Sequence, residues 1–113
     1  MAEHGEWNKK GATLSDATAL KDYGVDTDFI VQGIRAGQLE YREGAIWGNP
    51  YIKVLRSQLE RFIAEKLGSN YLTKRTAQTE LRKVNKEIAE LKKKIKELQA
   101  RKDEIEKSDG LQA

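Results

Sequence analysis

The sequence contains no cysteine, one histidine and one proline. Without cysteine, disulfide bonds and cysteine-ligated zinc or iron–sulfur sites are excluded. The histidine, His4, has no ligand partners at metal-binding spacing. No nucleophile–base pair or carboxylate pair stands out either. We therefore expect a protein that is not an enzyme and that holds no cofactor or metal.

Long apolar runs are also missing, since none approaches the roughly 18–20 residues of a membrane-spanning helix. Residues 1–12 contain no apolar stretch of the kind found in a signal peptide. The chain has 113 residues, of which 38% are hydrophobic and 35% charged. This size suits one small globular domain with an appendage. We expect a cytoplasmic protein without a membrane partner.

Positive charge is scarce in the first part of the chain. Residues 1–70 carry nine Lys or Arg against ten Asp or Glu, a net charge of −1, whereas residues 71–113 carry twelve against eight, a net charge of +4. An argument for nucleic-acid binding by the first part therefore cannot rest on overall charge.

The last third of the sequence has a heptad pattern. Apolar residues recur at alternating spacings of three and four, with one polar position at Lys102. Such a narrow apolar stripe on an otherwise polar helix is typical of a coiled coil. We predict that this helix pairs with a second copy through Leu81, Val84, Ile88, Leu91, Ile95, Leu98 and Ile105.

The charges beside this stripe do not decide the direction of pairing. A parallel pair sets Glu87 against Lys92, and an antiparallel pair sets Glu87 against Lys94. Both contacts are attractive. The antiparallel pair gathers the apolar layers in the centre and leaves Lys102 outside, which slightly favours it.

Cap signals predict two short helices in the first part of the chain. The first begins after Ser15 and ends at Gly24, with Leu20 and Tyr23 facing inward. The second begins after Asp26, with Val25 and Ile30 forming a hydrophobic staple. It carries Phe29, Ile30 and Ile34 on one face, and Gly37 ends it.

A hairpin and a third helix should follow. We predict strands over residues 39–42 and 51–55, joined by the loop 43–50, which contains Gly44, Gly48 and the proline. The sequence Ser57-Gln58-Leu59-Glu60 has the pattern of a capping box. It predicts a helix with Leu59, Phe62, Ile63 and Leu67 inward, closed by Gly68. The expected organisation is a flexible arm (1–12), a head (13–68), a connector (69–72), a coiled-coil helix (73–107) and a disordered tail (108–113).

The segment from residue 12 to residue 67 resembles the winged helix-turn-helix heads of MerR-type regulators and excisionase-like proteins. The resemblance lies in TLSDATALKDYGVDTDFIVQGIRAGQLEYREG followed by YIKVLRSQLERFI. Gly24-Val25 matches the turn, Gly37-Gln38-Leu39 matches the end of the second helix, and residues 56–60 match the start of the last helix. It implies a fold that is mainly α with a small β-hairpin, followed here by a long coiled-coil helix.

The resemblance also implies binding of double-stranded DNA, with the second helix in a major groove and the hairpin beside it. Residues 27–36 would form the groove helix. Gln32 would contact an adenine edge and Arg35 a guanine or a phosphate. The full set of implied contacts is Thr27, Asp28, Gln32, Arg35, Arg42, Lys53, Arg56 and Lys21.

The sequence departs from that family at Asp26 and Asp28, where related heads carry neutral or basic residues. A carboxylate there suits the helix dipole but repels phosphate. Trp47 is either a contact at the tip of the hairpin or a lid over the core. Two functions follow: a dimeric DNA-binding protein (a transcriptional regulator, an excisionase-like protein or a phage DNA-handling factor), or a non-enzymatic adaptor whose head binds a polypeptide.

Overall fold

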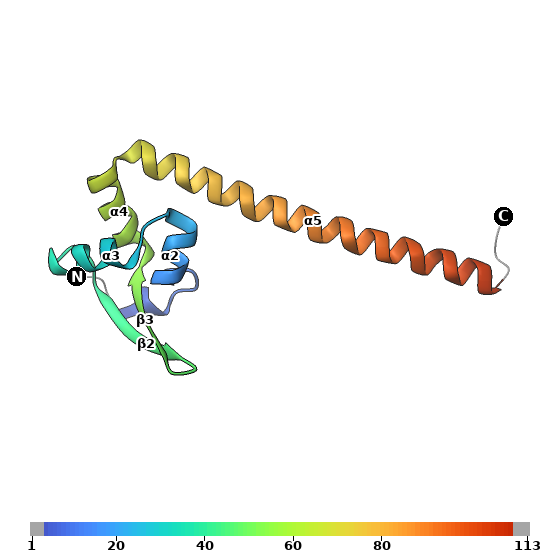
Figure 1. Cartoon of the computed structure of the whole chain (residues 1–113), viewed down its shortest axis with the longest axis horizontal. Coiled ribbons are helices and arrows are strands. Elements are labelled where there is room, and N and C mark those ends of the chain that lie inside the picture. The colour runs from blue at the N-terminus through green and yellow to red at the C-terminus, as the bar shows by residue number, and fades with distance from the viewer. Residues whose placement is uncertain (1–3, 110–113) are drawn as a thin grey trace. The chain divides into compact units, whose positions relative to one another are not determined.

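The computed structural model describes residues 4–109 (Figure 1). The chain divides into two compact units, one up to Thr79 and one from Glu80 onward. Its described residues are mainly helical. In chain order they are α1 (His4–Asn8), β1 (Thr13–Ser15), α2 (Asp16–Tyr23), α3 (Thr27–Arg35), β2 (Tyr41–Ile46), β3 (Asn49–Leu55), α4 (Arg56–Leu67) and α5 (Ser69–Asp109). The expected mainly helical chain with a small β-hairpin and a long C-terminal helix is thus confirmed, and the hairpin is part of a three-stranded sheet.

The sheet has three strands in the order β1-β3-β2, all antiparallel. β1 is a strand that the sequence did not predict. It pairs Leu14 with Val54, and both side chains are buried. Such a short strand forms only because β3 supplies its hydrogen-bond partners.

The predicted eight-residue hairpin loop is wrong. β2 and β3 pair as far as Ile46 and Asn49, and only Trp47 and Gly48 form the turn. Both turn residues have positive φ angles, 53° and 81°. A two-residue turn of this kind matches the twist of the strands but suits glycine or asparagine better than a large aromatic residue.

The core lies between the sheet and helices α2, α3 and α4. Its largest fully buried members include Phe62, Ile30 and Val54. The rings of Phe29 and Phe62 lie 4.9 Å apart. At Gly33 a Cβ atom would lie 2.6 Å from Leu39 Cδ1, so only glycine allows this close packing. The core cluster as a whole is Leu14, Ala19, Tyr23, Val25, Ile30, Leu39, Val54, Leu59, Phe62 and Ile63.

The predicted caps of α2 and α3 are confirmed. The Ser15 side chain accepts a hydrogen bond from Thr18 N, and the Asp26 carboxylate accepts one from Phe29 N. Gly24 follows α2 in the left-handed conformation, at φ 72°. Leu20, which was predicted to face inward, is 54% exposed because the inward face of this short helix is filled by Ala19 and Tyr23.

The predicted capping box at α4 is wrong. The helix begins at Arg56, directly after the buried strand residue Leu55, and no side chain caps it. Ser57 therefore lies inside the first turn, where its hydroxyl donates to Glu6 Oε1 at 2.6 Å. Gly68 ends the helix as predicted. Leu67 was expected inward but is 45% exposed.

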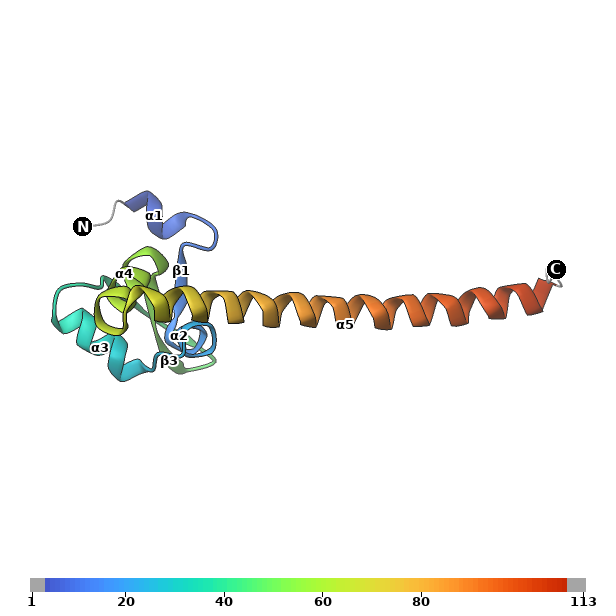
Figure 2. The ribbon, with the colours of Figure 1, turned by 90° about the horizontal axis from the view of Figure 1, so that it is seen from above.

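The expected flexible arm is also corrected, because residues 4–8 form the short helix α1 (Figure 2). Beyond the bond between Glu6 and Ser57, Trp7 lies against the guanidinium of Arg42, which is 4.4 Å from the ring centroid. After α1, the carbonyl of Gly11 accepts a hydrogen bond from Arg56 Nε at 3.0 Å. Contacts distant in the sequence thus order this segment.

The expected connector at residues 69–72 is helical and belongs to α5. Three side chains near the start of α5 donate to the last carbonyls of α2. Tyr71 Oη binds Tyr23 O at 2.7 Å, Arg75 Nη2 binds Lys21 O at 3.2 Å, and Thr79 Oγ1 binds Asp22 O. The last carbonyls of a helix have no partner within it. Residues 69–79 of α5 therefore form part of the head.

Within the described residues, the second unit is one uninterrupted helical segment from Glu80 to Asp109. Residues 108 and 109 of the predicted disordered tail are helical, and residues 110–113 lie outside the described residues. Among the helices of residues 4–109, none is both long and apolar enough to cross a membrane.

Gly24 offers a test of the junction between α2 and α5. A Cβ there would lie 2.9 Å from Tyr71 Oη, whereas a Cβ at Gly37 meets nothing within 4 Å. Both glycines have positive φ, at 72° and 74°. Gly37→Ala should lower the free energy of unfolding in urea only by the backbone cost of about 1–2 kcal/mol. Gly24→Ala should lower it clearly more, because its Cβ would also meet Tyr71. Equal losses of unfolding free energy in the two variants would contradict the packing described.

Candidate functional site

The outward face of α3 carries the polar residues that the sequence singled out. Gln32 and Arg35 are exposed, while Ile30 and Gly33 on the opposite face are buried. Val31, which belongs to neither the exposed nor the buried set, is half-buried. The helix thus presents one hydrogen-bonding amide and one guanidinium to solvent, on a backbone fixed by the core.

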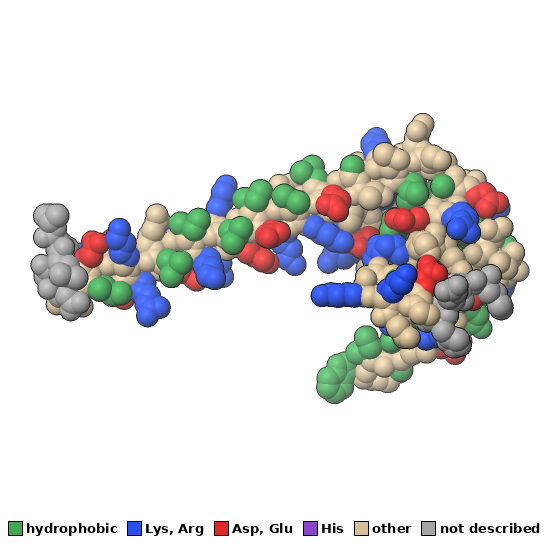
Figure 3. Space-filling view, turned by 180° about the vertical axis from the view of Figure 1, so that it is seen from behind, with side chains coloured by type: hydrophobic (Ala, Val, Ile, Leu, Met, Phe, Trp, Pro, Cys, Tyr) green, Lys and Arg blue, Asp and Glu red, His purple; other side chains and the backbone are tan. Residues whose placement is uncertain are grey.

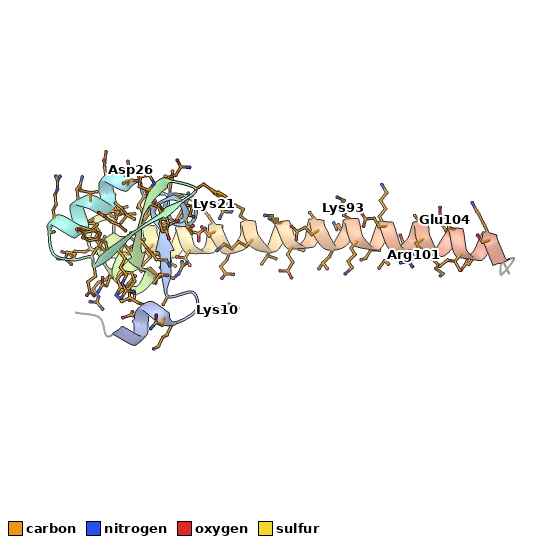
Figure 4. The ribbon with its side chains drawn as sticks, turned by 90° about the horizontal axis from the view of Figure 1, so that it is seen from below. Lys10, Lys21, Asp26, Lys93, Arg101 and Glu104 are labelled. Carbon is orange, nitrogen blue, oxygen red and sulfur yellow. The ribbon has the colours of Figure 1, made fainter. Side chains whose placement is uncertain are left out.

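The start of α3 is acidic and internally bonded. Thr27 Oγ1 donates to Asp16 Oδ2 at 3.0 Å, and the other oxygen of that carboxylate accepts from Ile52 N at 3.3 Å. Asp26 caps the helix (Figure 4), and Asp28 is exposed. The hydroxyl of Thr27 is therefore bonded within the head, and the carboxylates here repel phosphate.

A pocket of about 360 Å³ adjoins this acidic start. It lies between the N-terminal ends of α2 and α3 and the hairpin. Two carboxylates contribute to its walls, which favours cations over anions. Its lining residues are Asp16, Thr27, Glu43, Gly44, Pro50, Tyr51 and Ile52.

Two predicted contacts lie side by side on the hairpin. Arg42 of β2 is directly opposite Lys53 of β3. Because side chains alternate along a strand, both project from the face opposite the buried Val54. Arg42 is exposed and stacks on Trp7. Arg42 and Lys53 therefore lie on the sheet face that points away from the core. Gln32 and Arg35, in contrast, lie on a helix that packs on that core.

Arg56, another predicted phosphate contact, is bonded into the head. Its Nη1 donates to Tyr23 Oη at 2.8 Å, and Tyr23 Oη donates to Glu60 Oε2 at 2.7 Å. Burial and the hydrogen bond to Glu60 raise the pKa of Tyr23 from 10.0 to about 12, whereas Arg56 acts to lower it. This chain of bonds joins α2 to α4, so Arg56 has a structural role.

Lys21, the eighth predicted contact, lies on α2 beside the junction with α5 (Figure 4). Its side chain is exposed, and its carbonyl accepts the hydrogen bond from Arg75. The structure therefore divides the eight predicted residues among three surfaces: the outward face of α3, the outer face of the hairpin, and the region where α2 meets α4 and α5.

Trp47 is 96% exposed, so the expectation of a lid over the core is wrong. Ile46 beside it is 60% exposed. Figure 3 shows hydrophobic side chains standing out at the end of this hairpin. The sequence contains no charged residue between Glu43 and Lys53. The tip is thus an uncharged, apolar projection.

The second unit carries the other candidate surface. The apolar residues at the predicted pairing positions are each about half exposed, between 44% and 60%. Figure 3 shows hydrophobic and charged side chains along the same helix. At the polar position, Lys102 Nζ lies 3.9 Å from Glu106 Oε1. The exposed fractions are 60% for Leu81, 46% for Val84, 44% for Ile88, 53% for Leu91, 55% for Ile95, 54% for Leu98 and 48% for Ile105.

Sequence reasoning missed the contribution of α5 to the head. Tyr71 and Leu72 pack against the core, and Thr79 is buried. The available signal was an aromatic and an apolar residue directly after Gly68, ahead of the regular heptads. Among residues 4–109, no group of three or more His, Cys, Asp or Glu side chains is placed to hold a metal ion.

The raised pKa of Tyr23 predicts a loss of stability in strong base. Since the pKa is 10.0 unperturbed and about 12 in the fold, the neutral phenol stabilises the fold fully below pH 10, and this contribution is lost between pH 10 and 12. Tyr23→Phe should be less stable by about 1–3 kcal/mol at pH 8. It should also show a smaller decrease in urea-unfolding free energy over pH 10–12, because it lacks the Tyr23 phenol that ionises there. Identical pH slopes for the two proteins would contradict this assignment.

Comparison with protein-family models, curated proteins and solved structures finds no match. The likeness to MerR-type and excisionase-like heads therefore stays a prediction from sequence, and the function of the chain is inferred from its own surfaces.

Proposed function

We propose that this protein is a dimeric DNA-binding protein whose winged helix-turn-helix head consists of α2, α3, the β2–β3 hairpin and α4. It would serve as a transcriptional regulator, an excisionase-like protein or a phage DNA-handling factor. The observation that carries the proposal is the outward face of α3, where Gln32 and Arg35 are exposed on a helix whose other face is buried.

The order of elements supports this proposal. α2 ends at Tyr23 and α3 begins at Thr27, so a three-residue turn with a left-handed Gly24 joins them. A β-hairpin and α4 follow. Helices that read DNA this way place a few side chains against base edges in the major groove. A glutamine is suited to adenine and an arginine to guanine, or to a backbone phosphate.

The half-exposed apolar stripe of α5 supports self-association. Burial of one such side chain contributes roughly 1.5–3 kcal/mol before entropy. A second copy is the matching occupant because the stripe repeats in heptads, and because the flanking charges attract in either direction: Glu87 meets Lys92 in a parallel pair and Lys94 in an antiparallel pair.

A second function from another class has its own support. The acidic start of α3 disfavours phosphate, and the uncharged hairpin tip presents an exposed tryptophan. Tryptophan is enriched among the residues that dominate protein–protein binding energies. The alternative is therefore an adaptor whose head binds a polypeptide and whose coiled coil sets its oligomeric state.

Binding of mixed-sequence duplex DNA at several salt concentrations tests the first function. Affinity should fall steeply with salt, and Arg35→Ala should weaken binding about tenfold, the effect of one good base or phosphate contact. Lys66→Ala, which removes one positive charge from the exposed surface of α4, is the matched control and should have little effect. No duplex binding at low salt would reject the DNA function in favour of the adaptor.

Light scattering at tens of micromolar tests the pairing. The wild-type chain should be a dimer, and Ile88→Gln with Leu91→Gln should give a monomer whose head stays folded. The control is Ala89→Gln with Ala100→Gln, which adds the same side chains at heptad positions outside the apolar stripe. A monomeric wild-type chain would end the pairing proposal.

A further inference from the structure

The helical unit carries a second ordered surface besides its apolar stripe. With the apolar residues at heptad positions a and d, positions b, c and f lie on the opposite side of the helix. From residue 86 to residue 100, position c holds Glu90 and Glu97. Positions b and f hold Lys86, Ala89, Lys93, Lys96 and Ala100. All five are exposed. We name Lys86, Lys93 and Lys96 the basic stripe.

Positive charge is concentrated along this stretch of α5. Residues 82–101 hold eight Lys or Arg against three Glu, a net charge of +5, whereas residues 102–109 hold two Lys against four Asp or Glu, a net charge of −2. The three glutamates of this stretch can pair with lysines and arginines at i, i+4 spacing, but they cannot offset all eight positive charges, and the excess is exposed.

The local surroundings of the basic stripe differ along its length. Glu90 lies four residues after Lys86 and three before Lys93, and Glu97 lies four residues after Lys93, so these two lysines have acidic neighbours on the helix surface. Lys96 has lysines one turn before it and the neutral Gln99 and Ala100 one turn after it. Neighbouring like charges on a helix cost a few tenths of a kcal/mol each, and a bound polyanion would remove that cost.

We propose that the basic stripe binds the sugar–phosphate backbone of duplex DNA without regard to sequence. Lys93 extends from α5 in Figure 4, and the stripe from Lys86 to Lys96 covers about 15 Å at 1.5 Å per residue. Duplex DNA carries a negative charge every 1.7 Å or so along its axis, so several phosphates fall within that length. Pairing through positions a and d leaves the stripe outside the coiled coil.

The same arrangement argues against an anionic membrane as the ligand. An interfacial helix buries large apolar side chains and keeps its cations beside them at the headgroups. On α5 the large apolar side chains are at a and d, opposite the stripe, and the small residues within the stripe are alanines. A helix lying on a membrane by its apolar face would turn the stripe toward water.

This inference shares its ligand with the proposed function but rests on different residues, so each can fail alone. In the full chain, Lys86→Gln, Lys93→Gln and Lys96→Gln remove the charge and keep good helix formers. Arg61→Gln, Lys66→Gln and Lys74→Gln remove equal charge from exposed positions elsewhere and serve as the matched control.

Binding to mixed-sequence duplex DNA is measured between 50 and 200 mM salt, with light scattering to confirm the oligomeric state of each variant. If each lysine neutralises one phosphate, the stripe variant should make the negative slope of log K against log salt shallower by roughly 2.7 per chain. The control should change it far less. Lys→Arg at the same three positions should restore the wild-type slope.

Equal slopes for the stripe variant and the control would overturn the inference, and retained sensitivity to Arg35→Ala would then leave the head function standing. A stripe effect without an Arg35 effect would support the stripe and count against the head. Stripe-dependent binding to phosphatidylserine vesicles, with no binding to duplex DNA, would overturn both in favour of a membrane ligand.

Discussion

The structure of the head depends on the C-terminal end of α2, where three side chains of α5 donate to backbone carbonyls that the helix cannot satisfy itself. Tyr71, Arg75 and Thr79 supply these bonds. Because an unpaired buried carbonyl is costly, the buried bond from Thr79 to the Asp22 carbonyl makes this end of α2 depend on α5. The close approach in turn requires glycine at position 24, where any side chain would meet Tyr71. The turn that leads into α3 is therefore built jointly by α2 and α5.

Helix α5 combines two kinds of sequence. Up to Thr79 its side chains bind and pack within the head. Beyond Glu80 its apolar side chains are half exposed at heptad spacing. The first part is stabilised by its own chain, and the second gains comparable burial only from a partner helix. This difference makes self-association part of the proposed function.

Positive charge is distributed unevenly between the two surfaces that we propose contact DNA. The start of α3 carries carboxylates, which limits the attraction of the head for phosphate, and the base-directed residues Gln32 and Arg35 lie farther along the helix. The excess positive charge lies on residues 82–101. If both proposals hold, the head supplies selectivity and the basic stripe supplies affinity, a division of labour that general and base-specific contacts permit.

Local features were determined by the sequence itself. Ser15, Asp26, Gly24 and Gly68 mark helix ends through bonds within about four residues, and the heptads fix the long helix in the same way. The exposed face of α3 follows from its helical period. These features need no information from distant parts of the chain, so sequence patterns predict them.

Only the tertiary structure decided the features that depend on distant partners. β1 exists because Leu14 pairs with Val54, and the N-terminal segment is ordered by Ser57 and Arg56. The hairpin pairs up to Trp47 because the strand register continues to that point. The eight predicted contacts separate onto three surfaces for the same reason: hydrogen bonds and packing across the core determine where each side chain points, and these interactions join residues that lie far apart in the sequence.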